Sequence, residues 1–431
     1  MRTLSAARFV KRTDRRQRVP PALTRGTERV DGISILDEIG GDLGLLLWRS
    51  ARNVALWAET RPEHRAGLFP GSAAQARIAE LADAEVHAEL AGPLSVFAEL
   101  LARPGEVDLG RLVNACRRVA GWAEQRGSLS TALEFSQAAA MAAPESASLA
   151  YFVGRLARRR AEYDRAESWY TRAAIQGRLT SDWRSYALAF AGMGNLHMQR
   201  GNYPAARRSH LRSLKVAERR GMIDLVGNAC HDLFAVEGEL RPGVEAERYA
   251  AAAFRAYGPS NPKLHRLSYD IAYYWTLQGF FSGALRVAQA LVPHLEDPAM
   301  CALLQGVIAR AAAGAGRKDV FDAAVWEATR LINSGTASEM TARTLLGLAY
   351  GAMSLGEWEL ASRWALQSQR TAASTKEGRV ALDAEALYEA AENRRHEAAT
   401  EPETASETAR TLADEVVVAL SRSTRPALVA V

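Results

Sequence analysis

Apolar residues recur along this chain at intervals of three and four positions, the spacing that gathers them on one face of a helix. The first such pattern predicts a helix over about 34–60, with Ile35 near its start and Trp57 near its end. A second helix is expected from Ser72 to about 91, and a third over 94–103. Valine and isoleucine form no alternating runs, so strands are not expected and the chain is predicted to be all-α.

From about residue 113 the helical pattern repeats itself. Stretches that begin at Val113 and Ala147 lie 34 residues apart, and a third and clearer one begins at Ala187. Later repeats start near 227, 265, 304 and 342, which widens the spacing to 38–40 residues. Self-similarity at such a period predicts a solenoid, in which each helical hairpin buries its apolar face against its neighbours.

The small and aromatic residues of these repeats resemble those of the tetratricopeptide repeat. That family has a small residue at the eighth position, like Gly154 and Gly194 here, and an aromatic residue just after the turn, like Tyr163 and Tyr203. The small residues let helix A of a repeat pack tightly against its own helix B and against the next helix A. The resemblance covers about 113–370 and implies a right-handed α-solenoid. The wider later period is similar to that of sensor domains in bacterial regulators.

These patterns divide the chain into four parts. A basic, flexible arm is predicted at 1–30, where arginines crowd together. A helical region outside the repeats is expected at 31–105. About seven tetratricopeptide-like repeats and a capping helix near 376–392 make up residues 106–394, because a solenoid needs its last apolar face covered. A polar linker and an amphipathic helix are predicted within 395–431.

The composition, 48% hydrophobic and 24% charged, is typical of a globular protein with a substantial core. The formal net charge is +5, and nearly all of the positive charge is arginine. A GC-rich bacterial genome explains this, and is favoured over a phosphate-binding surface. Two basic stretches lie near aromatic residues, as in nucleic-acid-binding surfaces, but ordinary solvated helix faces are preferred as their interpretation. Their members are Arg155, Arg158, Arg159, Arg160, Arg165, Arg207, Arg208, Arg212, Arg219 and Arg220.

Cysteine usage and hydropathy indicate the compartment. Cys116, Cys230 and Cys301 are odd in number and far apart, which fits buried thiols in a reducing cytosol better than disulfides or a zinc site. No apolar segment follows the basic N-terminus, as a secretion signal requires. The longest apolar stretches fall far short of the ~20 residues that cross a bilayer. A cytoplasmic protein without membrane contact is therefore expected.

Sequence signatures of catalysis are largely missing. The chain has no glycine-rich phosphate loop after a strand, no zinc-binding histidine pair on one helix face and no nucleophile elbow. Cys230, His231 and Asp232 are consecutive, and consecutive helix residues point about 100° apart, so they do not form a triad and Cys230 is expected in the core. His197 and His210 are interpreted as partly buried packing residues, with a metal-binding or pH-sensing pair as the alternative. No enzyme activity, cofactor or metal is predicted.

The resemblance implies a concave groove, lined by helix A residues at about the second, fifth, sixth and ninth positions. Aromatic, arginine and amide side chains stand there and suit peptide recognition, although any solvated helix face holds such residues. The candidate groove residues are Arg117, Arg118, Tyr151, Phe152, Arg155, Asn195, Asn228, His231, Asp232, Arg266, Tyr269, Asp270, Tyr273 and Tyr350. The carboxylate clamp of chaperone-binding relatives is not predicted, because Asn195 has Ala191 as its fifth-position partner.

The predicted function is that of a scaffold or adaptor that binds a protein or peptide in this groove. The alternative is a signal-sensing regulator that binds a small peptide and contacts nucleic acid through the basic arm and the arginines of 155–160. Such regulators usually carry a helix-turn-helix ahead of the repeats, and residues 34–103 show no convincing one. An enzyme is the least favoured class.

Overall fold

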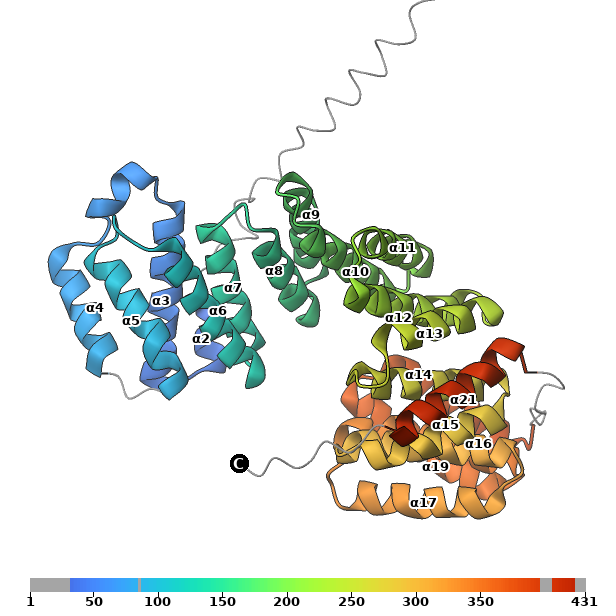
Figure 1. The fold of residues 1–431 in the computed structure, drawn as a ribbon. Helices are drawn as coiled ribbons and strands as arrows, with labels where there is room; N and C mark the ends of the chain where they lie inside the picture. The colour runs from blue at the N-terminus through green and yellow to red at the C-terminus, as the bar shows by residue number, and fades with distance from the viewer. Residues whose placement is uncertain (1–31, 84–86, 396–404, 423–431) are drawn as a thin grey trace, which may run out of the picture. The chain divides into compact units, whose positions relative to one another are not determined.

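The computed structural model describes residues 32–83, 87–395 and 405–422 (Figure 1). The regular elements in these ranges are helices, with no strand among them, as predicted. The predicted basic arm at 1–30 and most of the predicted linker lie outside the described residues. None of the described helices has both the length and the hydrophobicity to cross a bilayer. The chain divides into two compact units between Leu225 and Val226.

The first unit begins with helices that precede the repeats. They are α2 (Ile33–Glu38), α3 (Gly41–Glu59), the 3-10 helix η1 (Pro62–Gly67), α4 (Gly71–Asp83) and α5 (Ala88–Ala102). The single helix predicted over 34–60 is divided, because Ile39 is extended and Gly41 takes a φ of 68°. The carboxylate of Glu38 accepts hydrogen bonds from the backbone N–H groups of Ser130 and Thr131, at 2.7 and 2.8 Å. This early region is therefore fastened to the first repeat.

The helix break predicted between residues 91 and 94 is wrong, since α5 runs through Pro93. Proline has no N–H, so the carbonyl oxygen of Glu89 loses its donor within the helix. The guanidinium of Arg118, on the neighbouring α6 (Leu109–Gln125), donates to that oxygen at 3.1 Å. A side chain from another helix thus completes the backbone hydrogen bonding, and the helix continues.

The repeats are helix pairs joined by short turns, and consecutive helices pack together. In the first unit the pairs are α6 with α7 (Leu129–Ala142), α8 (Ala147–Arg159) with α9 (Tyr163–Leu179), and α10 (Trp183–Gln199) with α11 (Tyr203–Arg219). The helix α12 (Ile223–Leu240) contains the division between the units. The predicted architecture of tetratricopeptide-like hairpins is confirmed.

The second unit continues the same pattern. Its helices are α13 (Val244–Tyr257), α14 (Lys263–Gln278), α15 (Phe281–Leu291), η2 (Val292–His294), α16 (Pro298–Gly314), α17 (Lys318–Asn333), η3 (Ser338–Met340), α18 (Thr341–Ser354), α19 (Trp358–Thr375), α20 (Gly378–Glu392) and α21 (Glu407–Arg422). The helix α20 packs against α18 and α19. The helix α21 returns to pack on α13 and α15, where it buries Leu412 and Val416 and pairs Asp414 with Arg286 at 2.7 Å.

Eighth-position glycines mark where helix A meets helix B of its own repeat. A Cβ added at Gly154 would lie 2.8 Å from the Tyr170 ring, and one added at Gly194 would lie 2.4 Å from the His210 ring. Both rings are buried. The predicted tight packing is confirmed. His210 is a packing residue that is fully rather than partly buried, while His197 is half-buried and burial lowers its pKa.

In the second unit, glycines also set the distance between successive A helices. A Cβ added at Gly347 on α18 would lie 2.7 Å from the carbonyl oxygen of Gly306 on α16. A Cβ added at Gly306 would lie 3.0 Å from the carbonyl oxygen of Thr344. The two helices therefore meet backbone against backbone, with no side chain between them at this point.

We expect Gly347→Ala to destabilise the second unit by about 1–3 kcal/mol, the usual cost of overpacking a close contact. The added methyl group would meet a backbone oxygen, which cannot rotate away as a side chain does. The control is Gly121→Ala in α6, where an added Cβ has no neighbour within 4 Å. That change should stabilise the helix by about 0.5–1 kcal/mol. Urea unfolding followed by circular dichroism measures both variants, and wild-type stability of Gly347→Ala would rule out the backbone contact.

Candidate functional site

An aromatic ring lies between two arginines in the first unit. The guanidinium carbons of Arg117 and Arg155 lie 5.4 and 5.6 Å from the ring centroid of Phe152 on α8. Tyr151 lies beside this ring, with the two centroids 5.7 Å apart. Phe152 is half-buried and Arg117 is exposed. These four predicted groove residues form one group, the Phe152 cluster.

Glu124 on α6 holds the arginine side of this cluster. Its carboxylate accepts a hydrogen bond from Arg155 at 2.6 Å and another from Arg159. Burial opposes the ionisation of Glu124, but the hydrogen bonds and charges of the two arginines hold its pKa below the ordinary value. Arg155 is therefore fixed in place by an ion pair within the unit.

Much of the first predicted basic stretch is likewise engaged inside the unit. Arg160 and Arg165 both pair with the carboxylate of Glu162, each at 2.8 Å. Their positive charge is thus balanced by an acid of the same repeat. This favours the structural interpretation of the stretch over phosphate binding.

The remaining groove candidates of the first unit are Arg118 and Asn195. Arg118 completes the backbone hydrogen bonding of α5, as described above. Asn195 lies half-buried on α10. Neither forms a hydrogen bond with the Phe152 cluster in the described part of the chain.

In the second unit, His231 pairs with an acid from another helix. Its Nε2 lies 2.9 Å from Oδ2 of Asp270 on α14, and its Nδ1 lies 3.3 Å from the hydroxyl of Tyr257 on α13. The adjacent Cys230 is in the core, as predicted, and Asp232 lies half-buried on α12. The histidine therefore belongs to a network between helices.

Two more groove candidates extend this network. Asn228 Oδ1 accepts hydrogen bonds from the Tyr257 hydroxyl at 3.2 Å and from Lys263 Nζ at 2.5 Å. The Nε of Arg266 donates to Asp270 at 3.0 Å. Through these hydrogen bonds, partly to one another and partly to Tyr257 and Lys263, the candidates tie α12, α13 and α14 together. Their hydrogen bonding fits a structural role better than ligand binding.

The last three candidates lie on two A helices of the second unit, α14 and α18. Tyr269 and Tyr273 on α14 stack with their ring planes 7° apart and their centroids 6.3 Å apart. Tyr350 on α18 has the guanidinium carbon of Arg310, from α16, 4.0 Å from its ring centroid. Counted from 265, 302 and 342, residues Tyr273, Arg310 and Tyr350 all occupy the ninth position of a repeat. We refer to these three residues as the ninth-position row.

The charges within this row influence one another. Burial lowers the pKa of Arg310, and the Tyr350 and Tyr273 phenols oppose that shift. Burial raises the pKa of Tyr350, the charge of Arg310 opposes the change, and Asp383 on α20 adds to it. Burial raises the pKa of Tyr269 as well. Among the described residues, no carboxylate pairs with Arg310 and no hydrogen bond engages it.

Arg310 is not among the groove residues predicted from the sequence, because its repeat is predicted to start near 304. Counting from Ala302 gives the signal that finds the residue, since the ninth position then falls on Arg310. A neighbouring apolar residue, Leu277, is missed as well. It lies one turn after Tyr273 on α14 and is 48% exposed.

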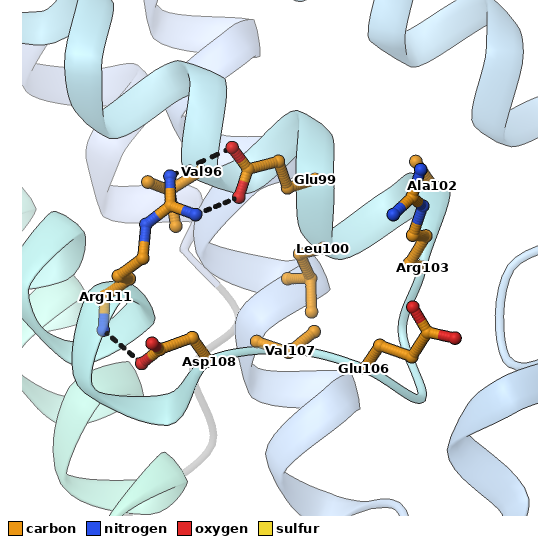
Figure 2. Close-up of a pocket in the computed structure, with 9 residues that line it drawn as sticks. All are labelled: Val96, Glu99, Leu100, Ala102, Arg103, Glu106, Val107, Asp108 and Arg111. Atoms are coloured by element: carbon orange, nitrogen blue, oxygen red, sulfur yellow. Dashed lines mark hydrogen bonds and ion pairs between the residues drawn. The ribbon is translucent and has the colours of Figure 1, made fainter.

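A pocket of about 520 Å³ lies in the first unit between the end of α5 and the start of α6 (Figure 2). Its apolar lining includes Val96, Leu100 and Val107. The Arg111 guanidinium reaches both oxygens of Glu99, at 2.8 and 2.9 Å, and the Arg111 backbone N–H donates to Asp108 at 3.0 Å. These polar groups hold the first turn of α6 in place. No group of three potential metal ligands occurs in the described residues.

No protein-family model and no curated protein matches the chain. Among solved structures it is similar to BtubC (BKLC) from P. vanneervenii, with 16% identity, covering 53% of this chain and 92% of that chain at a TM-score of 0.42. It is also similar to the TPR2AB domain of yeast Sti1 in complex with pHSP90, with 16% identity. That match covers 66% of this chain and 99% of the Sti1 chain at a TM-score of 0.28. A Rap protein complexed with competence and sporulation factor shows 9% identity. That match covers 82% of this chain and 98% of the Rap chain at a TM-score of 0.36. These similarities are distant, and the tetratricopeptide-like architecture is established by the helix pairs and eighth-position glycines described above.

We expect Glu124→Gln to lower the free energy of unfolding of the first unit by about 0.5–1 kcal/mol at neutral pH. Arg155 and Arg159 would lose the anion that holds them. Because the pKa of Glu124 is lowered in the folded state, its contribution is present above the unfolded pKa and is lost as pH falls through the folded pKa.

The Gln variant should therefore lose less stability than the wild type between about pH 5 and pH 3. Urea unfolding at several pH values measures the difference. Glu99→Gln is the control, since its ion pair with Arg111 is largely exposed and should matter less. The same acid sensitivity in Glu124→Gln and wild type would contradict the assigned role.

Proposed function

We propose that this chain is a binding scaffold that holds a protein or peptide segment against the A helices of its second unit. The observation that carries the proposal is the ninth-position row. Tyr273 is 45% exposed and Leu277, one turn further along α14, is 48% exposed. Partly exposed aromatic side chains next to an arginine are the residues that contribute most to protein interfaces.

The row also has the form that an extended segment needs. Its side chains come from α14, α16 and α18, so the contacts are distributed over successive repeats. A bound segment would touch one side chain from each helix in turn. The three helices would not need to move relative to one another. The Phe152 cluster offers a separate aromatic and cationic contact in the first unit.

Binding, rather than catalysis, is the function that these side chains support. His231 is engaged by Asp270 and Tyr257. Burial raises the pKa of the Cys116 thiol to about 12, which keeps it unreactive. We propose a cytoplasmic location, since none of the three cysteines, all within the described residues, forms a disulfide. A peptide-sensing regulator would use the same binding surface, with a different output.

Peptides selected on the wild-type chain from a random phage-displayed library should bind Tyr273→Ser/Leu277→Ser at least about tenfold less tightly. The substitutions remove exposed aromatic and apolar area and leave the core intact. Fluorescence anisotropy with the synthetic peptides measures the dissociation constants. Trp326→Ser is the matched control, because Trp326 is 67% exposed but stands on the B helix α17. Equal affinity for the double variant and the wild type, or a library from which nothing is enriched, would overturn the proposed function.

A further inference from the structure

Among the described residues, Arg310 is a half-buried cation with no paired anion. Its closest recorded partner is the ring of Tyr350, 4.0 Å from the guanidinium carbon. An aromatic face attracts a cation but does not neutralise it. Taking an arginine partly out of water is costly when no carboxylate compensates. The centre of the ninth-position row is therefore a site of uncompensated positive charge.

Two other arginines, close enough to Tyr269 to influence its pKa, are already paired with acids. Arg266 pairs with Asp270 at 3.0 Å, and Arg343 on α18 pairs with Glu377 at 2.7 Å. Arg310 differs from both, since no acid of the described chain engages it. One anion-binding position is thus left open, rather than a broadly basic surface.

We propose that Arg310 binds the carboxylate of an acidic residue in the segment held by the second unit, and that it determines the specificity of that surface. The inference rests on the proposed function, since it assigns the chemistry of the segment bound there. Tyr273 and Leu277 would take an adjacent aromatic or apolar side chain of the same segment. The recognised motif is an acidic residue beside a hydrophobic one.

A carboxylate fits this site better than a phosphate group. A guanidinium that packs on a ring keeps its edge N–H groups for a planar, bidentate acceptor. One guanidinium supplies one positive charge, which matches a single carboxylate. Asp383 lies close enough to Tyr350 to influence its pKa, and this negative charge would disfavour a dianion.

The first test uses peptides selected from the random library on the wild-type chain and synthesised with blocked ends. We expect a shared Asp or Glu in these peptides. Arg310→Met should weaken their binding about tenfold or more, as loss of a charge-assisted hydrogen bond does. Replacing the shared acid by its amide should weaken wild-type binding equally and leave Arg310→Met binding unchanged. Two further peptides identify the preferred anion. One carries a free C-terminal carboxylate in place of the shared acidic side chain, and the other carries a phosphoserine at that position.

The second test separates binding from folding. Removing an unpaired, half-buried cation should leave the thermal midpoint of Arg310→Met unchanged or higher. Arg363→Met, an exposed arginine of α19, is the control and should change neither binding nor stability. Arg310→Lys keeps the charge but not the planar fork, so intermediate affinity is expected.

Three results would overturn the inference. The first is that the selected peptides share no acidic residue. The second is equal affinity of the selected peptides for Arg310→Met and wild type, and the third is a lower thermal midpoint of Arg310→Met, which would mark a structural role. Peptides that need Tyr273 but not Arg310 would remove this inference and leave the proposed function standing. A library that yields no binder would remove both.

Discussion

The candidate site depends on how closely two helices approach where neither has a side chain. Gly347 on α18 faces the carbonyl oxygen of Gly306 on α16 at a distance that leaves no room for a methyl group. Arg310 stands about one turn beyond Gly306, and Tyr350 follows Gly347 by three residues. The guanidinium consequently lies 4.0 Å from the ring centroid before any ligand arrives. Glycine at these two positions therefore preorganises the cation that we assign to ligand binding.

Other glycines leave room for an aromatic ring of a neighbouring helix. In the first unit, Tyr170 packs against Gly154 and His210 against Gly194. Burial raises the pKa of Tyr170 to about 12, and its ring serves packing. Rings used in this way are unavailable to a ligand. The second unit uses the same packing, with the Phe321 ring against Gly351.

The periodic features of the fold could be predicted from the sequence, because small residues at fixed spacing have one main use in helical hairpins. Features that depend on contacts between distant residues could not. Pro93 lies within a helix because Arg118 supplies the missing donor. His231 pairs with Asp270, 39 residues away, and not with its neighbour in sequence. A position count along each repeat identifies which residues face the same side, but not which of them neutralise one another. Arg310 is distinguished only by its contacts, since no carboxylate of the described residues pairs with it.

The most direct measurement of this dependence is a double-mutant cycle. The affinity of one acid-containing peptide, selected on the wild-type chain, would be measured for wild type, Gly347→Ala, Arg310→Met and the double variant. Because the glycine contact positions the guanidinium, Arg310→Met should cost much less affinity once Gly347→Ala has moved the helices apart. We expect a coupling free energy on the order of 1 kcal/mol. Strictly additive effects would contradict the central claim, since Arg310 would then bind its ligand independently of the helix contact.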